Sequence, residues 1–311
     1  MKTQVTFALL LVLALSSCKR EEKETTTRGS LHALLAESVA PAMVEEVNQF
    51  LSNYEKNGAK ITYDVVSSDQ AIRRMIRDTV RYIVTTRPLN AGERQQLPAI
   101  KGFDLNEILI AYDGIAVAVN PKNPVEQMTT VELAKILSGE ISRWEQLSHA
   151  ESMKGKIELF YQDSTDISSF VDARLLHGQA VRKDFHPTHS SLQTLQSIAS
   201  QPSSIALVGV LWVDSSHVSP KILKIGETKQ QADTTFRLAP EAIGKFYSPH
   251  PANVYRNFYP LKRAIYSYMY APLGSLASGF GAFVANSEGQ RFFLQKGIVP
   301  ATQKIRLKGS E

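Results

Sequence analysis

The fold is decided by residues 108–147, which read ILIAYDGIAVAVNPKNPVEQMTTVELAKILSGEISRWEQL. The first part of this stretch is apolar at both odd and even positions, which is typical of a strand buried on both faces in an α/β sheet. Pro121 ends the strand because proline lacks the N–H that a strand ladder needs. Thr129 or Thr130 then supplies an N-cap for a helix that ends at Gly139. The residues alone therefore predict a buried strand, a turn and a helix.

The same stretch carries a more particular pattern. From Asp113 it reads Asp-Gly-Ile-Ala-Val-x-Val-Asn-Pro-x-Asn-Pro, and from Thr129 to Trp144 it reads Thr-x-x-x-Leu-x-x-Ile-x-x-Gly-x-Ile-x-x-Trp. This pattern resembles the phosphate-binding proteins of ABC importers, in which the segment leads from one lobe to the other. The resemblance implies an α/β protein with the two-lobed type II periplasmic-binding-protein fold and two hinge crossings.

The resemblance continues toward the C-terminus. Residues 258–266 match the family's Tyr-Pro-Leu-x-Arg-x-Ile-Tyr, and residues 289–300 match its closing Glu-Gly-Gln and Gly-x-x-Pro. The aromatic and proline residues of these motifs are most simply packing and turn residues, so they indicate the fold and not the ligand. The implied division places lobe I at 29–112 plus 213–311 and lobe II at 113–212.

The N-terminus has the pattern of a targeting segment. Lys2 precedes an apolar run from Val5 to Leu15, which is too short for a lasting membrane anchor but suits the core of a secretory signal. Small residues then precede Cys18, and this arrangement resembles a bacterial lipoprotein signal in which residues 1–17 are removed and Cys18 is acylated. The alternative is an ordinary signal peptide with a stray cysteine.

The segment after the cysteine is polar. Residues 19–28, KREEKETTTR, have no apolar content, so we expect residues 18–28 to form a flexible tether between lipid and domain. The acids in this segment resemble a surface-export signal of some lipoproteins, and both the outer surface and the periplasmic side remain open as locations. The chain has no cysteine other than Cys18, so disulfide and thiolate chemistry are excluded from the mature protein.

Charge and composition exclude one large class of function. The chain has 311 residues, a formal net charge of +5 and a pI of about 9.1. Its basic residues are scattered, and no basic stripe is interleaved with stacking aromatics, so the sequence does not indicate nucleic-acid binding. The histidines at 177, 186 and 189 lack the spacing and the acidic partners of a metal site, so we interpret them as part of a solvated loop.

The first candidate ligand loop is Ser38-Val39-Ala40-Pro41, which lies between a predicted strand and an amphipathic helix. A helix N-terminus presents unpaired amides with partial positive charge, and a serine at that position adds a donor for an anion. The alternative is that Ser38 only caps the helix. The loop resembles the family's Ser-Thr-Val-x-Pro with serine in place of threonine, which implies that Ser38 and Val39 contact the ligand.

Two further strand ends carry hydroxyl groups. Ser67 and Ser68 follow the predicted strand 60–66, and Thr85, Thr86 and Arg87 end the next strand. Ligands of open α/β sheets gather at such carboxyl ends. Thr86-Arg87 resembles the family's Ser-Arg-x-Leu, and Arg87 is the expected charged partner of an anion. The family's glycine beside the serines is missing, and so is the acid that in some members accepts the phosphate proton.

A second junction of strand, hydroxyl and helix lies at Ser164-Thr165. It resembles the family's Ser-Gly-Thr or Ser-Ser-Thr, but Asp163 and Asp166 flank it and the basic residue common near this motif is missing. Each additional carboxylate about 5 Å from a bound anion would oppose it by on the order of 1 kcal/mol at a dielectric constant close to that of water, and by more if buried. Either these acids point outward or the ligand is not plain phosphate.

The resemblance implies a solute-binding lipoprotein in the cell envelope that captures inorganic phosphate, or a related oxyanion, between its lobes. It further implies delivery to ABC permease subunits, attachment to the membrane through Cys18, a monomeric state, and no cofactor, metal or reaction. One alternative is a binding or sensory lipoprotein of the same fold with a changed ligand. Another is phosphoester hydrolysis, although no nucleophile is backed by a histidine base in a recognisable arrangement.

Overall fold

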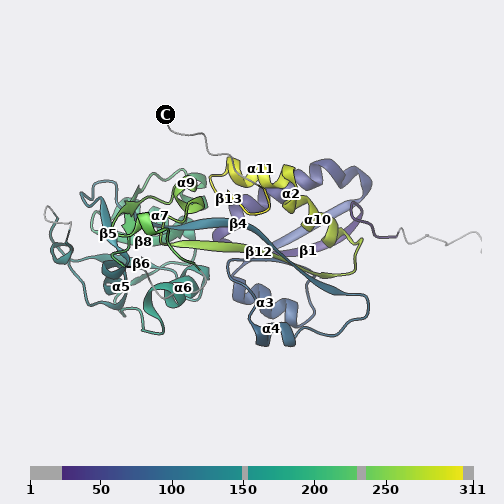
Figure 1. The fold of residues 1–311 in the computed structure, drawn as a ribbon, viewed down its shortest axis with the longest axis horizontal. Coiled ribbons are helices and arrows are strands. Elements are labelled where there is room, and N and C mark those ends of the chain that lie inside the picture. The colour runs from purple at the N-terminus through teal and green to yellow at the C-terminus, as the bar shows by residue number, and fades with distance from the viewer. Residues whose placement is uncertain (1–22, 149–152, 230–235, 304–311) are drawn as a thin grey trace, which may run out of the picture.

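The computed structural model describes residues 23–148, 153–229 and 236–303, and Figure 1 shows the chain as two bodies joined by long strands. The predicted signal peptide at 1–17 and the predicted acylation site Cys18 lie outside the described residues. Within the described ranges, none of the helices combines the length and apolarity that a bilayer crossing requires.

Lobe I is a mixed sheet covered by helices on both faces (Figure 1). Strand order in this part is β2-β1-β3-β12-β4, with β1, β2 and β3 parallel to one another. The strands are β1 (Gly29–Ala36), β2 (Ala59–Val66), β3 (Tyr82–Thr85), β4 (Asp104–Val119), β12 (Lys262–Ala271) and β13 (Val299–Pro300). The helices are α2 (Ala40–Tyr54), α3 (Ser68–Ile76), α4 (Ala91–Gln95), α10 (Leu276–Ala285) and α11 (Ser287–Gln295).

Lobe II continues the same sheet in the order β4-β8-β6-β7 and adds a small sheet of β11, β10 and β5. Its strands are β5 (Gln127–Thr129), β6 (Glu158–Tyr161), β7 (His186–Pro187), β8 (Ser204–Gly209), β9 (Lys221–Ile222), β10 (Lys224–Gly226) and β11 (Phe246–Tyr247). Its helices are α5 (Thr130–Ser138), α6 (Asp166–Val171), α7 (Ser191–Ser200), α8 (Val210–Ser215) and α9 (Pro251–Tyr255).

Two strands connect the lobes. β4 pairs with β12 over its first part and with β8 from Ile115 to Val119, so a single strand belongs to both lobes. β12 runs antiparallel beside it (Figure 1). The pairing has a register shift between Ile265 and Tyr266. The predicted pair of hinge crossings therefore corresponds to β4 and β12.

Residues 108–147 form the strand, the turn and the helix that their sequence predicts. The second half of β4 is almost fully buried, as expected for a strand that is apolar on both faces. Thr129 is the N-cap of α5, and it forms a capping box with Glu132. Gly139 ends the helix with φ 89°, a left-handed conformation that glycine adopts without steric cost.

The predicted lobe boundary is wrong for one long segment. β9 pairs with the lobe II half of β4, and β10 pairs with β5. Leu223, Ile225, Val254 and Tyr259 pack in the core of lobe II. The described parts of this segment, 221–229 and 236–261, therefore extend lobe II, whereas the predicted boundary assigned them to lobe I from 213 onward. The weak hydrophobic pattern of this segment did not reveal which sheet its short strands join.

Part of the predicted flexible tether, residues 18–28, is in contact with lobe I, and residues 18–22 lie outside the described residues. Thr25 and Arg28 pair through their backbones, and the Arg28 guanidinium donates to the Asn57 carbonyl at 2.8 Å. The Glu24 carboxylate accepts from the backbone N–H of Leu276 at 3.0 Å, which places it at the start of α10. Residues 24–28 thus lie against lobe I, because polar residues can pack through hydrogen bonds to backbone groups without an apolar face.

Candidate functional site

The site lies where α3 of lobe I meets α6 of lobe II. Three groups of lobe I converge there: the hydroxyl of Ser38, the backbone N–H of Ser68 and the guanidinium of Arg263. We call these three groups the cradle. Ser38 and Arg263 are buried, with 1% and 5% exposure. The cradle consists of hydrogen-bond donors in a desolvated setting, which is the chemistry that stabilises an anion.

Ser38 is held in the cradle by its position and by its neighbours. It follows β1 in a short helical turn that leads into α2. Its Oγ accepts a hydrogen bond from Arg263 Nη1 at 3.0 Å, and Arg263 Nη2 donates to Asp113 at 2.7 Å. Gly209 allows this packing, because a side chain at that position would come within 2.6 Å of the Ser38 carbonyl oxygen. The adjacent Val39 is the N-cap of α2 and packs in the core of lobe I.

The start of α3 supplies the amide of the cradle. Ser67 is the N-cap, and its hydroxyl accepts from the N–H of Gln70 at 3.3 Å. The next N–H, that of Ser68, has no partner inside the helix because it belongs to the first turn. The Ser68 hydroxyl accepts from the N–H of Thr86 at 2.9 Å and lies 3.3 Å from the Thr86 hydroxyl. The predicted ligand loops at Ser67-Ser68 and at Thr85-Thr86 therefore meet. The hydroxyl of Ser68 holds them together through its hydrogen bond to Thr86.

The predicted charged partner, Arg87, is directed elsewhere. Its guanidinium forms ion pairs with Asp69 and Glu93, both at 2.7 Å. The hydrogen bonds that Arg87 donates to Glu93 and Asp69 raise the pKa of Arg87 further above its ordinary value. The nearby Thr85 hydroxyl donates to the Arg87 carbonyl at 2.7 Å. The guanidinium that contacts Ser38 belongs instead to Arg263 of β12.

The lobe II side of the site presents a carboxylate. Asp166, the first residue of α6, is 4% exposed and reaches across to lobe I. Asp166 Oδ2 accepts from the Ser38 hydroxyl at 3.2 Å, and Asp166 Oδ1 accepts from the Ser68 N–H at 2.7 Å. The sequence left open whether the flanking acids point outward. Asp166 points into the site and not into solvent.

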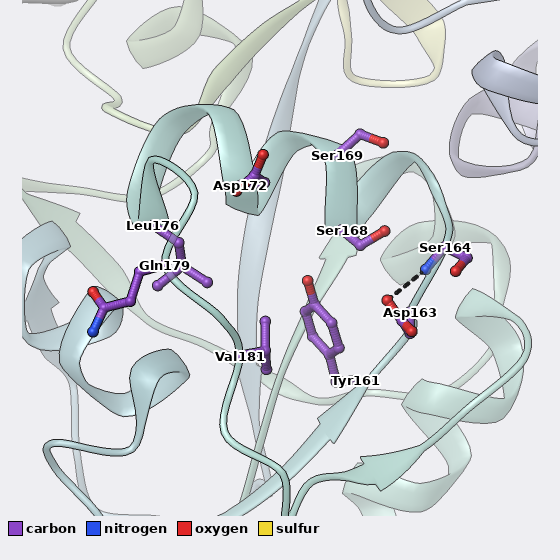
Figure 2. Close-up of a pocket in the computed structure, with 9 residues that line it drawn as sticks. All are labelled: Tyr161, Asp163, Ser164, Ser168, Ser169, Asp172, Leu176, Gln179 and Val181. Atoms are coloured by element: carbon purple, nitrogen blue, oxygen red, sulfur yellow. Dashed lines mark hydrogen bonds between the residues drawn. The ribbon is translucent and has the colours of Figure 1, made fainter.

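Ser164 and Thr165 serve the local structure of this loop. Thr165 is the N-cap of α6, and its hydroxyl donates to the Gln162 carbonyl at 2.9 Å. Ser164 is exposed and has φ 58°, the left-handed conformation that is uncommon for residues other than glycine. Its N–H donates to Asp163 Oδ1 at 2.8 Å (Figure 2). Within the described residues, neither side chain forms a hydrogen bond to the cradle.

Ser164 lines a separate pocket of about 300 Å³ in lobe II (Figure 2). Asp163, Asp172 and the ring of Tyr161 line the same pocket. Burial and the charges of these two carboxylates raise the pKa of Tyr161 above its ordinary value. This pocket is acidic, so it disfavours the anion that the cradle favours.

A second carboxylate crosses between the lobes in the opposite direction. Glu37, next to Ser38, accepts from the N–H and from the hydroxyl of Ser191 at the start of α7, both at 3.0 Å. Burial raises the pKa of Glu37, although the hydrogen bonds from Ser191 oppose that shift. Trp212 Nε1 donates to the Glu37 carbonyl at 2.9 Å. Each lobe therefore places one carboxylate on a helix start of the other.

Sequence reasoning missed four residues of this site: Glu37, Asp113, Ser191 and Arg263. Asp113 and Arg263 lie inside the two motifs that carried the resemblance, where they were interpreted only as parts of fold motifs. One signal was available for Arg263: a charged residue in an otherwise buried strand needs a buried partner. In the described part of the chain, no group of three or more His, Cys, Asp or Glu side chains is arranged to hold a metal ion.

Known proteins resemble this chain over most of its length. The phosphate-binding protein PstS of Borreliella burgdorferi is 25% identical over 244 residues, covering 75% of this chain and 81% of that protein. The PstS of Pseudomonas aeruginosa is 22% identical over 306 residues, covering 92% and 88%. An ABC-type phosphate transport receptor from Vibrio cholerae superposes with a TM-score of 0.64 at 18% identity, covering 88% of this chain and all of that one.

A family model gives the assignment directly. The model of the PBP superfamily domain matches residues 20–288, which include both lobes and both connecting strands. The solved relatives share the two-lobed architecture, in agreement with the fold predicted from residues 108–147. The chain belongs to the PBP superfamily.

Proposed function

We propose that the protein is an extracytoplasmic solute-binding protein that captures an oxyanion, inorganic phosphate in the first place, between its lobes for an ABC importer. One observation carries this proposal: the Ser38 hydroxyl and the Ser68 N–H both donate to the two oxygens of one buried carboxylate from the opposite lobe. A carboxylate edge and a phosphate edge present the same pair of acceptor oxygens. The groups that hold Asp166 are therefore suited to hold an oxyanion.

The electrostatics of the cradle support the same ligand class. Arg263 is buried beside Ser38, and its Nε has no hydrogen-bond partner among the described residues. The start of α3 adds the partial positive charge of its unpaired amides. The resembling proteins named phosphate-binding protein PstS add support, because the match to the Pseudomonas aeruginosa protein covers 92% of this chain.

The two connecting strands supply the movement that capture requires. β4 pairs in both lobes and β12 runs beside its lobe I part, so bending where β12 ends and β8 begins opens and closes the space between α3 and α6. An anion that contacts both lobes favours the closed form by its differential affinity. The closed form is then presented to permease subunits. In this proposal the protein is tethered to a membrane through Cys18, and it performs no reaction.

One observation favours a second function, in which the same fold serves a different ligand. Asp166 lies in the cradle and Asp163 lies in the neighbouring pocket, so the lobe II loop adds negative charge where a phosphate dianion would bind. A binding or sensory protein whose solute is less charged than phosphate would tolerate these acids.

Titration calorimetry with phosphate, sulfate and a panel of carboxylates and other anions distinguishes the two functions. We expect phosphate to bind, and we expect Ser38→Ala to weaken it. Ser52→Ala is the matched control, because the Ser52 hydroxyl is exposed and donates only to the Gln49 carbonyl of the same helix. No heat from phosphate at millimolar concentration, together with heat from another solute, would support the second function.

A further inference from the structure

Asp166 is placed unlike an ordinary acid in the first turn of a helix. Such an acid usually stays near the amides of its own helix, where the helix dipole favours it. In α6 the N–H of Ser168 donates to the hydroxyl of Thr165, and the two residues form a capping box. The Asp166 carboxylate is instead directed away from its own helix, and both of its oxygens accept hydrogen bonds from lobe I.

The space beside the cradle that the Asp166 carboxylate occupies, which we call the seat, is buried. Asp166 is 4% exposed, Ser68 is 2% exposed and Ser38 is 1% exposed. An ionised carboxylate is costly to bury unless donors and a countercharge compensate for it. Two donors and the guanidinium of Arg263, which donates to the same Ser38 hydroxyl, provide that compensation. This is the environment that a bound oxyanion would need.

We infer that Asp166 is a built-in ligand: its carboxylate occupies the oxyanion seat, holds the two lobes together when no solute is bound, and must leave before a solute anion can enter. The inference rests on the proposed function for the identity of that anion, but the closure of the empty protein by Asp166 does not depend on it.

The Asp166 carboxylate and a solute anion cannot favourably occupy the seat at the same time. Glu37 and Asp166 both lie at the lobe boundary. Burial is the main cause that raises the pKa of Glu37; the charge of Asp166 also raises it, and the charge of Arg263 lowers it. The Arg263 guanidinium, which is already paired with Asp113, therefore also faces the carboxylates of Asp166 and Glu37. A phosphate dianion would add two charges to this group, so it can enter only if the Asp166 carboxylate moves out. An anion must therefore bind the cradle more favourably than the Asp166 carboxylate does, so Asp166 disfavours weakly binding anions.

Hydrogen exchange with mass spectrometry tests this inference on the phosphate-free protein. The Ser68 N–H is bonded to Asp166, and the Ser191 N–H is bonded to Glu37 at the other bridge. In Asp166→Ala we expect peptides containing either amide to exchange at least tenfold faster, because the lobes separate. Asp163→Ala removes the same charge from the same loop without touching the cradle, so both amides should keep their protection.

Faster exchange at Ser191 as well as at Ser68 would support the inference, because Ser191 does not contact Asp166. Unchanged exchange at Ser191 in Asp166→Ala would overturn it, since Asp166 would then be a local contact that does not hold the lobes. Melting curves confirm folding, and Asp166→Asn, which keeps the size but not the charge, is evaluated by the same criterion if the alanine variant does not fold.

A phosphate titration of the same variants separates this inference from the proposed function. We expect Asp166→Ala to bind phosphate at least tenfold more tightly than the wild type, and phosphate should restore protection at Ser68. If the lobes of Asp166→Ala open but neither protein binds phosphate, the closure by Asp166 stands and phosphate is excluded as the solute. Equal or weaker phosphate binding by a folded Asp166→Ala would contradict the displacement of Asp166 by solute.

Discussion

The two edges that meet between the lobes carry opposite chemistry. The lobe I edge presents donors, namely the Ser38 hydroxyl, the Ser68 N–H and the Arg263 guanidinium. The lobe II edge presents acids, with Asp166 in the seat and Asp163 in the pocket beside it. Lobe I therefore retains a surface complementary to an anion, and lobe II supplies an anion of its own. If the cradle is the solute site that we propose, the affinity should depend on the loop at 163–166 as much as on the cradle.

The largest effect is expected from the ion pair that supports the donor edge. Arg263 and Asp113 form a buried pair at 2.7 Å, with side-chain exposures of 3% and 0%. Arg263→Met leaves the Asp113 carboxylate buried without its cation, so we expect a loss of about 3–5 kcal/mol in the free energy of unfolding. Denaturant titration measures it. The double variant Arg263→Met/Asp113→Asn should recover much of the loss, and a loss below about 1 kcal/mol in the single variant would contradict the assigned pairing.

The comparison of the two edges is sharpened by two serine variants. Ser38 donates to the occupant of the seat, whereas Ser164 is exposed on the lobe II loop. Ser38→Ala should weaken oxyanion binding by about 1.5–3 kcal/mol, as for a lost hydrogen bond to a charged group. Ser164→Ala should leave the affinity nearly unchanged. Calorimetry measures both affinities. A larger loss of affinity in Ser164→Ala than in Ser38→Ala would mean that the solute binds to the lobe II loop and not to the cradle.

Glu46 of α2 is a buried carboxyl group without a hydrogen-bond donor in the described part of the chain, in contrast to Asp166. Both of its oxygens lack a hydrogen-bond partner among the described residues, and burial raises its pKa to about 9. The folded protein then holds a proton that the unfolded chain releases near pH 4.5, so stability falls as pH rises between these values. Glu46→Gln removes this dependence, and its advantage over the wild type should grow by up to about 1.4 kcal/mol from pH 6 to pH 7.

Thermal melts of both proteins across pH 5–8 provide the measurement. Glu45→Gln is the control, because the Glu45 carboxylate is paired with Lys296 at 2.6 Å on the surface. An advantage of Glu46→Gln that stays constant with pH would mean that Glu46 is ionised in the folded protein.

The smallest effect is expected at Arg87, the residue that the sequence placed in the site. Its guanidinium is partly exposed and bound to Asp69 and Glu93, so Arg87→Ala should cost about 0.2–1 kcal/mol of stability. Oxyanion affinity should be unchanged, in contrast to the loss in Ser38→Ala. Loss of binding in Arg87→Ala, measured by calorimetry, would show that this guanidinium turns toward the cradle when solute is bound.

Much of the fold could be predicted from local signals. The strand at 108–119, the cap at Thr129 and the stop at Gly139 each depend on neighbouring residues, and the structure has all three. The membership of 221–229 and 236–261 in lobe II could not be predicted in the same way. It depends on pairing between β9 and β4 and between β10 and β5, and such long-range register leaves little pattern in short strands.

The site could be predicted only in part, for a similar reason. Hydroxyls at strand ends and helix starts indicated Ser38 and Ser68, which the structure brings to one place. The direction of a side chain is not encoded by its position alone. Arg87 follows a strand end yet turns to Asp69 and Glu93, while Arg263 is distant in sequence and reaches Ser38 across the sheet. Asp166 was identified as a difficulty for phosphate, but its role as occupant required the geometry.

A crystal structure of Asp166→Ala grown with phosphate tests the central claim most directly, namely that the cradle is the seat of the solute. We expect tetrahedral density in the space left by the Asp166 carboxylate, within hydrogen-bond distance of Ser38 Oγ and Ser68 N. A cradle that stays empty at saturating phosphate, or density only in the pocket beside Tyr161, would contradict the claim.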